Sequence, residues 1–439
     1  MSRLKKKIND FLKSLQEEEE VSLPQYITGP TNRKNNKIPK VLYSGPVWDM
    51  SEISAIIETV LSSNWLSSGE NVRKFEKKFS ELLGTQDSVM VNSGSSANLV
   101  MIAALKKYFN WSDNDEVIVS SVGFPTTVNA IIQNNLKPIF VDIDWKDLNW
   151  DLDDIERKIT KRTVGIFSSP VLGNPYDIDR LSDICEKNNI SMIGDNCDSL
   201  GTKWKNRHLS DYFVASSCSF YPAHHITTGE GGIVTSHNRD IVKIARSFAW
   251  WGRDCYCVGA ANLLSCGTCG KRFDKWLDAY DGIVDHKYLF VNQGYNLKPL
   301  DLQGAIGLEQ LKKLSYIHEK RRFFKNKIQA IFEKISLIRI PNELEKAETS
   351  WFSVPIICET GALKRGLVQH LESNGIQTRN YFAGNILMHP AYRDLGDYSE
   401  YKNACEVLDK VFFVGCSPNY DENTLEHIEN VVNNFIKEL

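Results

Sequence analysis

The residues of this chain that could do chemistry begin with one segment, Ser219–Gly232, which reads SFYPAHHITTGEGG. His224, the first of its two histidines, can take up and release protons near neutral pH. An imidazole cannot, however, form the stable covalent imine that a lysine forms with a carbonyl group. Five cysteines follow a separate pattern of spacing, and they are Cys197, Cys255, Cys257, Cys266 and Cys269. The sequence therefore predicts proton transfer at His224 and a metal centre formed by cysteines.

The other five cysteines stand singly among apolar residues, and we expect them to be packing residues: Cys185, Cys218, Cys358, Cys405 and Cys416. The first twenty residues, MSRLKKKINDFLKSLQEEEE, have neither the apolar centre nor the cleavage site of a secretion signal. We therefore expect a cytoplasmic protein whose thiols are buried or bind metal. A formal net charge of −3 and the lack of an apolar run of about 18 residues favour neither a nucleic acid nor a membrane as partner.

A phosphate site is predicted in the segment Asn92–Asn98, NSGSSAN, which lies between a β-rich run and a helical pattern. A glycine-serine turn at a helix start offers free backbone N–H groups and the positive end of the helix dipole. Ser219, at the end of another predicted strand, could supply a hydroxyl to the same phosphate. A capped helix with a glycine turn is the alternative explanation of this segment.

Seven short β-rich runs alternate with helical patterns over about 150 residues, and they are SVMV, EVIV, PIFV, TVGIF, ISMI, YFVASS and GIVTS. This alternation predicts a mostly parallel sheet covered by helices. Ligands of such sheets collect at the carboxyl ends of the strands. In this chain those ends carry small, polar or ionisable residues, so the pattern predicts a binding crevice.

We expect three parts in the chain. Leu4, Ile8, Phe11, Leu12 and Leu15 recur at helical spacing, which predicts an amphipathic N-terminal helix followed by a polar connector, within residues 1–50. Residues 51–310 would form a large domain with a cysteine-rich insertion around residues 251–290. Residues 311–439 would form a smaller α+β domain.

Several longer strings resemble one known family. NSGSSAN, GFPTTVNA, the DNCD turn, SFYPAHHITTGEGG and QGYNLKPLDLQGA are similar, in order and spacing, to the DegT/DnrJ/EryC1/StrS family of sugar aminotransferases and dehydratases. The resemblance covers the chain from about Lys40 onward. WLSSGENVRKFEKKF, SFYPAHHIT, WGRDCYC, CGKRF and FAGN resemble the branch of iron–sulfur 3-dehydrases that act on CDP-4-keto-6-deoxyglucose and make 3,6-dideoxy sugars for surface polysaccharides.

The resemblance implies the α/β fold of type I pyridoxal phosphate (PLP) enzymes, the aspartate aminotransferase-like fold. This fold has a mostly parallel seven-stranded sheet sandwiched by helices and a smaller α+β C-terminal domain. The resemblance also implies a homodimer with sites at the subunit interface and a nucleotide-sugar substrate. His224 stands where the family's lysine holds the cofactor as a Schiff base. This replacement implies elimination in place of amine transfer, with pyridoxamine 5′-phosphate (PMP) held without a covalent bond.

The same resemblance implies the other residues of the site. Asp195 takes the position of the partner of the pyridine nitrogen, and Phe124 takes that of a ring lying flat on the cofactor. The phosphate positions fall on three serines, which are Ser95, Ser96 and Ser219. Asn296 falls on a position that reaches the phosphate of the neighbouring subunit. Arg379 and the SSGEN and FAGN segments are candidate contacts of the sugar nucleotide.

A 2Fe-2S cluster on four cysteines is also implied by the resemblance. Fifty-seven residues separate Cys197 from Cys255, and one separates Cys255 from Cys257, as in the 3-dehydrases. The fourth ligand is Cys266 or Cys269, and the CGKRF flank favours Cys269. The cluster would receive electrons one at a time from an NADH-dependent flavin and iron–sulfur reductase. CYC and CGTC could instead form a closed four-cysteine zinc site without Cys197.

Three other functions stay open from the sequence. The first is a cluster-free dehydratase acting on GDP-4-keto-6-deoxymannose, which also has a histidine at this position. The second is an ordinary nucleotide-sugar aminotransferase, which His224 disfavours. The third is a non-enzymatic binding or regulatory protein of the same fold with a zinc-stapled loop.

Overall fold

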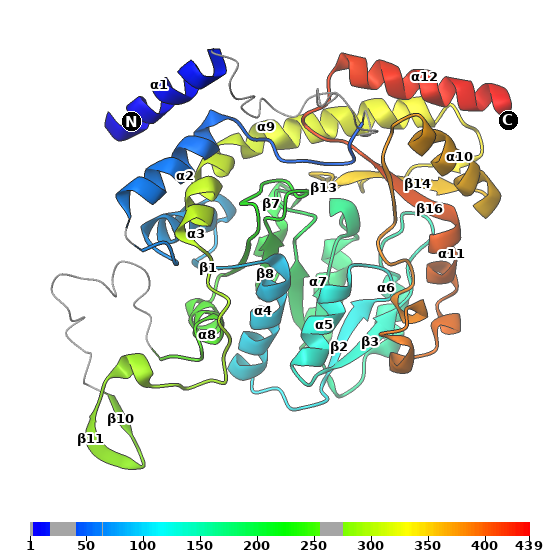
Figure 1. The fold of residues 1–439 in the computed structure, drawn as a ribbon. Coiled ribbons are helices and arrows are strands. Elements are labelled where there is room, and N and C mark those ends of the chain that lie inside the picture. Colours follow the sequence, from blue (N-terminus) through cyan, green and yellow to red (C-terminus); the bar gives the residue numbers. More distant parts are fainter. Residues whose placement is uncertain (1–2, 18–40, 64, 255–274) are drawn as a thin grey trace.

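The computed structural model describes residues 3–17, 41–63, 65–254 and 275–439 (Figure 1). Its centre is a seven-stranded sheet in the order β1-β9-β8-β5-β4-β2-β3. The strands are β1 (Asp87–Val91), β2 (Glu116–Ser120), β3 (Lys137–Val141), β4 (Thr163–Ser168), β5 (Ser191–Asp195), β8 (Ala215–Ser219) and β9 (Gly232–Ser236). Each overlaps one of the seven β-rich runs, and only β9 runs antiparallel to its neighbours, β1 and β8. The predicted mostly parallel sheet is confirmed.

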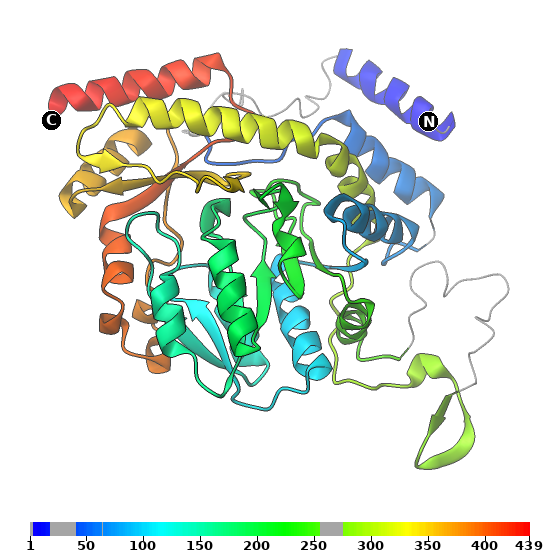
Figure 2. The same ribbon diagram turned by 180° about the vertical axis from the view of Figure 1, so that it is seen from behind.

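Helices cover both faces of this sheet because successive side chains of each strand point to opposite faces. Val117 and Val119 of β2 share one apolar cluster with α4 (Gly94–Tyr108), α5 (Pro125–Gln133) and α8 (Arg239–Ala249). Ile118, between them, packs with α6 (Leu152–Lys158) and α7 (Ile178–Asn188). Figures 1 and 2 show these two groups of helices on the front and the back of the sheet.

A second, antiparallel sheet of four strands lies in the C-terminal part of the chain, in the order β12-β14-β16-β15. Its strands are β12 (Ile338–Arg339), β14 (Ser353–Cys358), β15 (Thr378–Asn380) and β16 (Val411–Gly415). They pack with α10 (Gly361–Ser373) and α11 (Lys402–Lys410), and share an apolar cluster with α12 (Glu422–Glu438). The short strands β6 (Lys203–Trp204), β7 (Arg207–His208) and β13 (Ala347–Glu348) form a third sheet. Single 3-10 turns occupy Val171–Gly173, Leu209–Asp211, His286–Tyr288, Ile386–Met388, Arg393–Leu395 and Tyr398–Glu400.

Helix α9 (Asp301–Phe332) is the longest described helix, and it runs over the top of the molecule in Figure 1. It contacts α2 (Met50–Ser62) and α3 (Glu70–Leu83) near its start and α12 and β14 farther along. Residues 310 and 311 both lie inside this helix, so the expected domain boundary falls within one continuous element. The three-part division of the chain stays a prediction.

The predicted N-terminal helix is present as α1 (Arg3–Glu17). Its buried residues Ile8 and Leu12 pack against Met50, Ile53 and Ile57 of α2. Below the N-terminal helix in Figure 1, the hairpin of β10 (Lys275–Leu277) and β11 (Tyr280–Val284) projects from the body (Figures 1 and 2). No helix in the described ranges is long and apolar enough to cross a membrane.

Four of the five predicted packing cysteines, Cys185, Cys218, Cys358 and Cys416, are buried. Cys405 differs, since it is only partly buried and its thiol donates to the Tyr398 carbonyl oxygen at 3.2 Å.

Candidate functional site

Two turns meet at one edge of the sheet, because β5 and β8 are parallel neighbours whose carboxyl ends lie together. Asp195 pairs with Ser217 in the register of these strands. The backbone N–H of Asn196 donates to the Ser217 carbonyl oxygen at 3.0 Å. The DNCD turn after β5 therefore begins beside the SFYPAHHIT turn after β8, as expected for strand ends that carry a site.

The start of helix α4 lies against the end of β8. Ser93 caps the helix, and its hydroxyl accepts from the Ser96 N–H at 3.1 Å. A Cβ added to Gly94 would lie 2.5 Å from the Ser219 Cβ, so only glycine allows this approach. The predicted phosphate hydroxyl of Ser219 thus adjoins the free N–H groups of the helix start, which form a cradle suited to an anion.

Asp195 is buried and held on both carboxylate oxygens. Oδ2 accepts from Asn98 Nδ2 at 2.8 Å and from Thr127 Oγ1 at 2.7 Å. Oδ1 accepts from the Cys197 N–H at 3.2 Å. Because these donors come from α4, α5 and its own turn, the direction of the carboxylate is fixed.

His224 and Asp198 face each other across the two turns. His224 Nδ1 lies 3.5 Å from Asp198 Oδ1, and in this structure Nδ1 has no hydrogen-bond partner among the described residues. Burial, and second the nearby Arg321 charge, lowers the pKa of His224 to about 3. Burial, and second the Asp195 carboxylate, raises the pKa of Asp198 to about 7. Burial thus favours the uncharged form of both side chains, an imidazole base beside a carboxyl that can hold a proton.

The second histidine of the segment has different surroundings. His225 is buried, its Nε2 lies 3.2 Å from the Ser350 carbonyl oxygen, and its ring lies 5.6 Å from that of His318. Its ring is directed toward Ser350 and His318 in the interior. The geometry therefore favours His224 as the reactive member of the pair, as the sequence resemblance implies.

A series of aromatic contacts joins the predicted cofactor ring position to His224. Phe124 is 55% exposed, and its ring meets Phe382 edge-on with centroids 6.2 Å apart. Phe382 contacts Phe413, which contacts Phe352, whose ring lies 5.4 Å from that of His224. The exposed face of Phe124 is free to accept a flat ligand ring.

The remaining predicted residues lie near the start of α4 or at the surface. Ser95 is exposed and Ser96 is half-buried in the first turn of the helix. Asn296 is also exposed, and its segment is tied to the site because the Asn92 N–H donates to the Leu297 carbonyl oxygen at 2.9 Å. Asn296 accepts a hydrogen bond from Lys298.

Cys197 follows Asp195 in the DNCD turn. Burial, and second the Asp195 carboxylate, raises the pKa of its thiol well above the ordinary value. Within the described ranges, no three or more histidine, cysteine, aspartate or glutamate side chains could together hold a metal ion. Cys255, Cys257, Cys266 and Cys269 lie outside the described residues, so the cluster and zinc arrangements both stay predictions.

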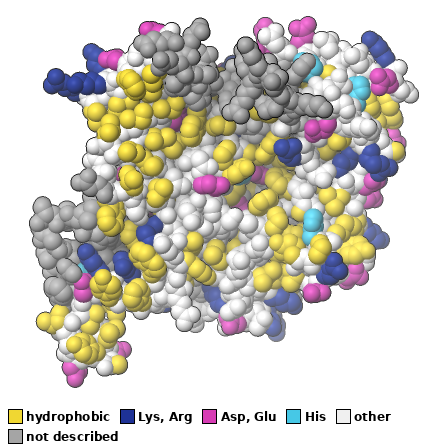
Figure 3. Space-filling view, viewed as in Figure 1, with side chains coloured by type: hydrophobic (Ala, Val, Ile, Leu, Met, Phe, Trp, Pro, Cys, Tyr) yellow, Lys and Arg dark blue, Asp and Glu magenta, His cyan; other side chains and the backbone are white. Residues whose placement is uncertain are grey.

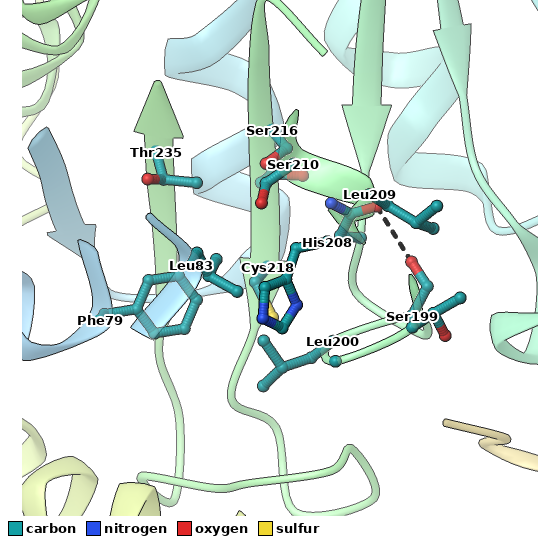
Figure 4. A pocket seen from close by; sticks show the side chains of 14 residues that line it. Phe79, Leu83, Ser199, Leu200, His208, Leu209, Ser210, Ser216, Cys218 and Thr235 are labelled. Carbon is teal, nitrogen blue, oxygen red and sulfur yellow. Dashed lines mark hydrogen bonds between the residues drawn. The ribbon is translucent and has the colours of Figure 1, made fainter. Parts of the chain in front are cut away.

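A small cavity lies against residues 216–218 of β8 and the turn that follows β5 (Figure 4). Its volume is about 10 Å³, which is room for roughly one water molecule. Cys218, Leu200 and His208 are among the residues that line it, and His224, Asp195 and Ser219 are not. This cavity is too small for a cofactor.

Comparison with known proteins agrees with this geometry. The model of the DegT/DnrJ/EryC1/StrS aminotransferase family matches residues 48–435. The chain belongs to this family. It is 35% identical over 405 residues to the dTDP-4-dehydro-2,6-dideoxy-D-glucose 3-dehydratase of Saccharopolyspora spinosa, covering 90% of this chain and 86% of that protein. It is 37% identical over 407 residues to the lipopolysaccharide biosynthesis protein RfbH of Salmonella typhimurium, covering 89% and 90%.

Solved structures of the family share the fold. The E. coli GDP-4-keto-6-deoxy-D-mannose-3-dehydratase with bound hydrated PLP superimposes with a TM-score of 0.79 and 30% identity, over 90% of this chain and all of that one. The predicted PLP-enzyme fold is therefore confirmed, and the proteins that this chain resembles include sugar 3-dehydratases.

Three residues of the site were not predicted from sequence: Asp198, Asn98 and Thr127. All three stand inside motifs that were recognised, namely DNCD, NSGSSAN and GFPTTVNA. The signal for Asp198 was available, since a second carboxylate three residues after Asp195 falls in the same strand-end turn. Asn98 and Thr127 carry no such signal, because their contact with Asp195 depends on how α4 and α5 pack.

Proposed function

We propose that this protein is a nucleotide-sugar 3-dehydrase that uses PMP and a 2Fe-2S cluster. The observation that carries the proposal is the His224–Asp198 pair, in which His224 takes, by the sequence resemblance, the position of the family's cofactor-holding lysine. A 3.5 Å imidazole–carboxyl pair can move protons but cannot form the lysine linkage. The reaction replaces the C3 hydroxyl of a nucleotide-linked 4-keto-6-deoxyhexose by hydrogen.

The described residues fit a phosphorylated pyridine cofactor. The cradle between the α4 start and Ser219 suits its phosphate, and the fixed Asp195 carboxylate suits its ring nitrogen. Ser95, Ser96 and Phe124 are the other proposed contacts. When bound, PMP supplies the amine that condenses with the C4 ketone and a pyridinium ring that takes up negative charge.

The protein's own side chains then manage protons and water. His224 Nδ1 faces Asp198, which leaves Nε2 to remove and return the proton. Asp198, on the Nδ1 side, orients the imidazole in the form that carries its proton on Nδ1, so that the Nε2 lone pair is available as the base. Phe352, Phe382 and Phe413 close one side of the site and exclude water from it. Arg379, whose guanidinium lies 4.3 Å from the Tyr43 ring, is a proposed contact of the sugar nucleotide.

The redox balance of the reaction requires an external donor. The C3–O bond breaks, the hydroxyl leaves as water, and two electrons and two protons are consumed in that loss and in forming the new C3–H bond. We assign the electron path to a 2Fe-2S cluster on Cys197, Cys255, Cys257 and Cys269, reduced by an NADH-dependent flavin and iron–sulfur reductase. The position of Cys197 in the Asp195 turn supports this assignment.

The cluster is tested by anaerobic purification followed by iron, sulfide and zinc analysis. We expect about two iron and two sulfide per chain, as a 2Fe-2S centre requires. Cys197→Ser should lose both, and Cys218→Ser, a buried cysteine on the neighbouring strand β8, is the matched control. Zinc without sulfide would establish the zinc alternative.

We propose that the homodimer interface includes the β10–β11 hairpin and the segment that follows it, up to Phe290. Tyr280, Ile283, Tyr288 and Phe290 are exposed there, and Figure 3 shows apolar side chains gathered over this region at the lower left. Apolar patches of this kind are typical of interfaces. Mixing inactive His224→Asn and Asn296→Ala chains should restore activity if Asn296 completes the neighbour's site, and sedimentation should give twice the chain mass.

The function itself is tested with CDP-, GDP- and dTDP-linked 4-keto-6-deoxyhexoses. With PMP, NADH and the reductase, mass spectrometry should detect a product that lacks one oxygen atom, and the CDP sugar should react fastest. A cluster-free GDP-4-keto-6-deoxymannose dehydratase is the second candidate, favoured by the similarity to the E. coli enzyme. That candidate predicts turnover with glutamate and without NADH. Amination of the sugar would contradict both.

A further inference from the structure

A buried arginine lies beneath the turn that carries His224. Arg321, on α9, is 1% exposed and forms no ion pair with any carboxylate of the described residues. Burying a guanidinium is costly unless its donors are used. The hydrogen-bond partners of the Arg321 guanidinium therefore indicate what this buried charge does in the fold.

The guanidinium binds main-chain carbonyl oxygens on two separate elements. Nη1 donates to Phe352 O at 2.7 Å and reaches Trp351 O at 3.5 Å, just before β14. Nη2 reaches Ala223 O and His224 O, each at 3.4 Å. One planar group thus joins the turn that carries His224 to the two residues that directly precede β14.

These two elements flank the imidazole of His224. The Phe352 ring lies 5.4 Å from the His224 ring, and Asp198 lies on the Nδ1 side at 3.5 Å. Movement of either backbone would change the direction of Nε2. Because Arg321 binds both backbones, it can fix the ring with respect to its two neighbours.

We propose that Arg321 is a positioning residue of the active site, which holds the His224 turn and the Phe352 backbone together and so fixes the imidazole between Phe352 and Asp198. This inference rests on the proposed role of His224 in proton transfer. Electrostatics supports it independently, since the Arg321 charge is the second cause, after burial, of the lowered pKa of His224. The other titratable groups around the imidazole are Asp198 and, on its own turn, His225 and Tyr221.

The test compares Arg321→Gln and Arg321→Lys with a control on the same helix. Arg322→Gln is matched, because Arg322 is the next residue but pairs with Glu343 at 3.0 Å and is partly exposed. In Arg321→Gln we expect kcat to fall about 100-fold, as for a misplacement of about 1 Å, with KM within about 3-fold of wild type. Arg321→Lys should recover part of kcat, and Arg322→Gln should stay within about 3-fold.

A second readout needs neither cofactor nor turnover. In the cofactor-free protein with labelled histidine, the His224 ring signal, assigned by its loss in His224→Asn, should stay neutral down to pH 5. In Arg321→Gln its titration should move upward, and the acid limb of any dehydration profile should move with it. Unchanged kcat and an unchanged His224 titration in Arg321→Gln would overturn the inference. If wild type and all the variants lack dehydration activity while the His224 titration still shifts in Arg321→Gln, only the proposed function is overturned.

If Arg321→Gln does not fold, a crystal structure of the wild-type holoenzyme decides. The guanidinium nitrogens should lie within hydrogen-bond distance of the carbonyl oxygens of residues 223, 224 and 352. A guanidinium that contacts only the Phe352 carbonyl oxygen, and neither carbonyl of the His224 turn, would overturn the inference.

Discussion

The two carboxylates of the DNCD turn lie three residues apart and have opposite surroundings. Asp195 accepts hydrogen bonds from Asn98, Thr127 and the Cys197 backbone. Asp198 accepts one backbone bond, from Leu172 at 3.3 Å, and faces an imidazole nitrogen that has no hydrogen-bond partner. Asp195, the proposed partner of the cofactor ring, therefore receives hydrogen bonds on both carboxylate oxygens. Asp198, the proposed partner of the imidazole, receives only one from the described residues. The difference indicates that rigidity serves binding and that incomplete pairing serves reaction.

Asp195→Asn should have the largest effect, because it replaces an acceptor held by two side-chain donors with an amide. We expect dehydration to fall by about 10³-fold and cofactor affinity to weaken, since a fixed charge of this kind is worth about that much. Turnover and cofactor titration measure the two effects. Asp183→Asn, on the exposed side of α7, is the control and should retain full activity.

Asp198→Asn should lower kcat by about 100-fold, since the amide N–H can donate to His224 Nδ1 and so favour the form whose proton sits on Nε2, which cannot act as the base. Cofactor affinity should change little, in contrast to Asp195→Asn. Equal loss of cofactor affinity in the two variants would remove the distinction between the two carboxylates.

The raised pKa of Asp198 also predicts a stability effect. A carboxyl with a folded pKa of about 7 stabilises the fold below its ordinary pKa, and this contribution is lost as pH rises toward 7. The unfolding free energy of cofactor-free Asp198→Asn, relative to wild type, should therefore rise by about 1.4 kcal/mol per pH unit between about pH 4 and 7. Urea unfolding at several pH values measures it, and a pH-independent difference would contradict the raised pKa.

Gly94→Ala tests the cradle, where an added Cβ would lie 2.5 Å from that of Ser219. Overpacking of this kind costs about 1–3 kcal/mol, so we expect cofactor affinity to weaken about tenfold or more. Gly45→Ala is the matched control, because an added Cβ there meets nothing within 4 Å.

Ser96→Ala should have the smallest effect. Its hydroxyl bonds to the Ser93 hydroxyl at 3.0 Å, within the same turn, so its loss should cost no more than about 1 kcal/mol in cofactor binding. A loss as large as that of Gly94→Ala would contradict this ranking of the two phosphate contacts.

Much of this architecture could be predicted from sequence, because strand runs and strand-end turns are local patterns. All seven runs became strands of the central sheet, and Asp195, Ser219 and His224 lie at its strand ends. The reversed direction of β9 could not be predicted, since composition does not encode direction. His224 and Asp198 are 26 residues apart in the sequence, and Arg321 follows His224 by almost a hundred residues. Both contacts depend on how strands and α9 pack, which no motif contains.

The most direct test of the account is the dehydration rate of His224→Asn, compared with wild type in the presence of PMP, substrate and reductant. Asparagine fills a similar space but cannot carry the proton, so we predict a loss of at least about 10²-fold in kcat while PMP still binds. A rate within about 3-fold of wild type would contradict the account, because no proton transfer at His224 would then be required.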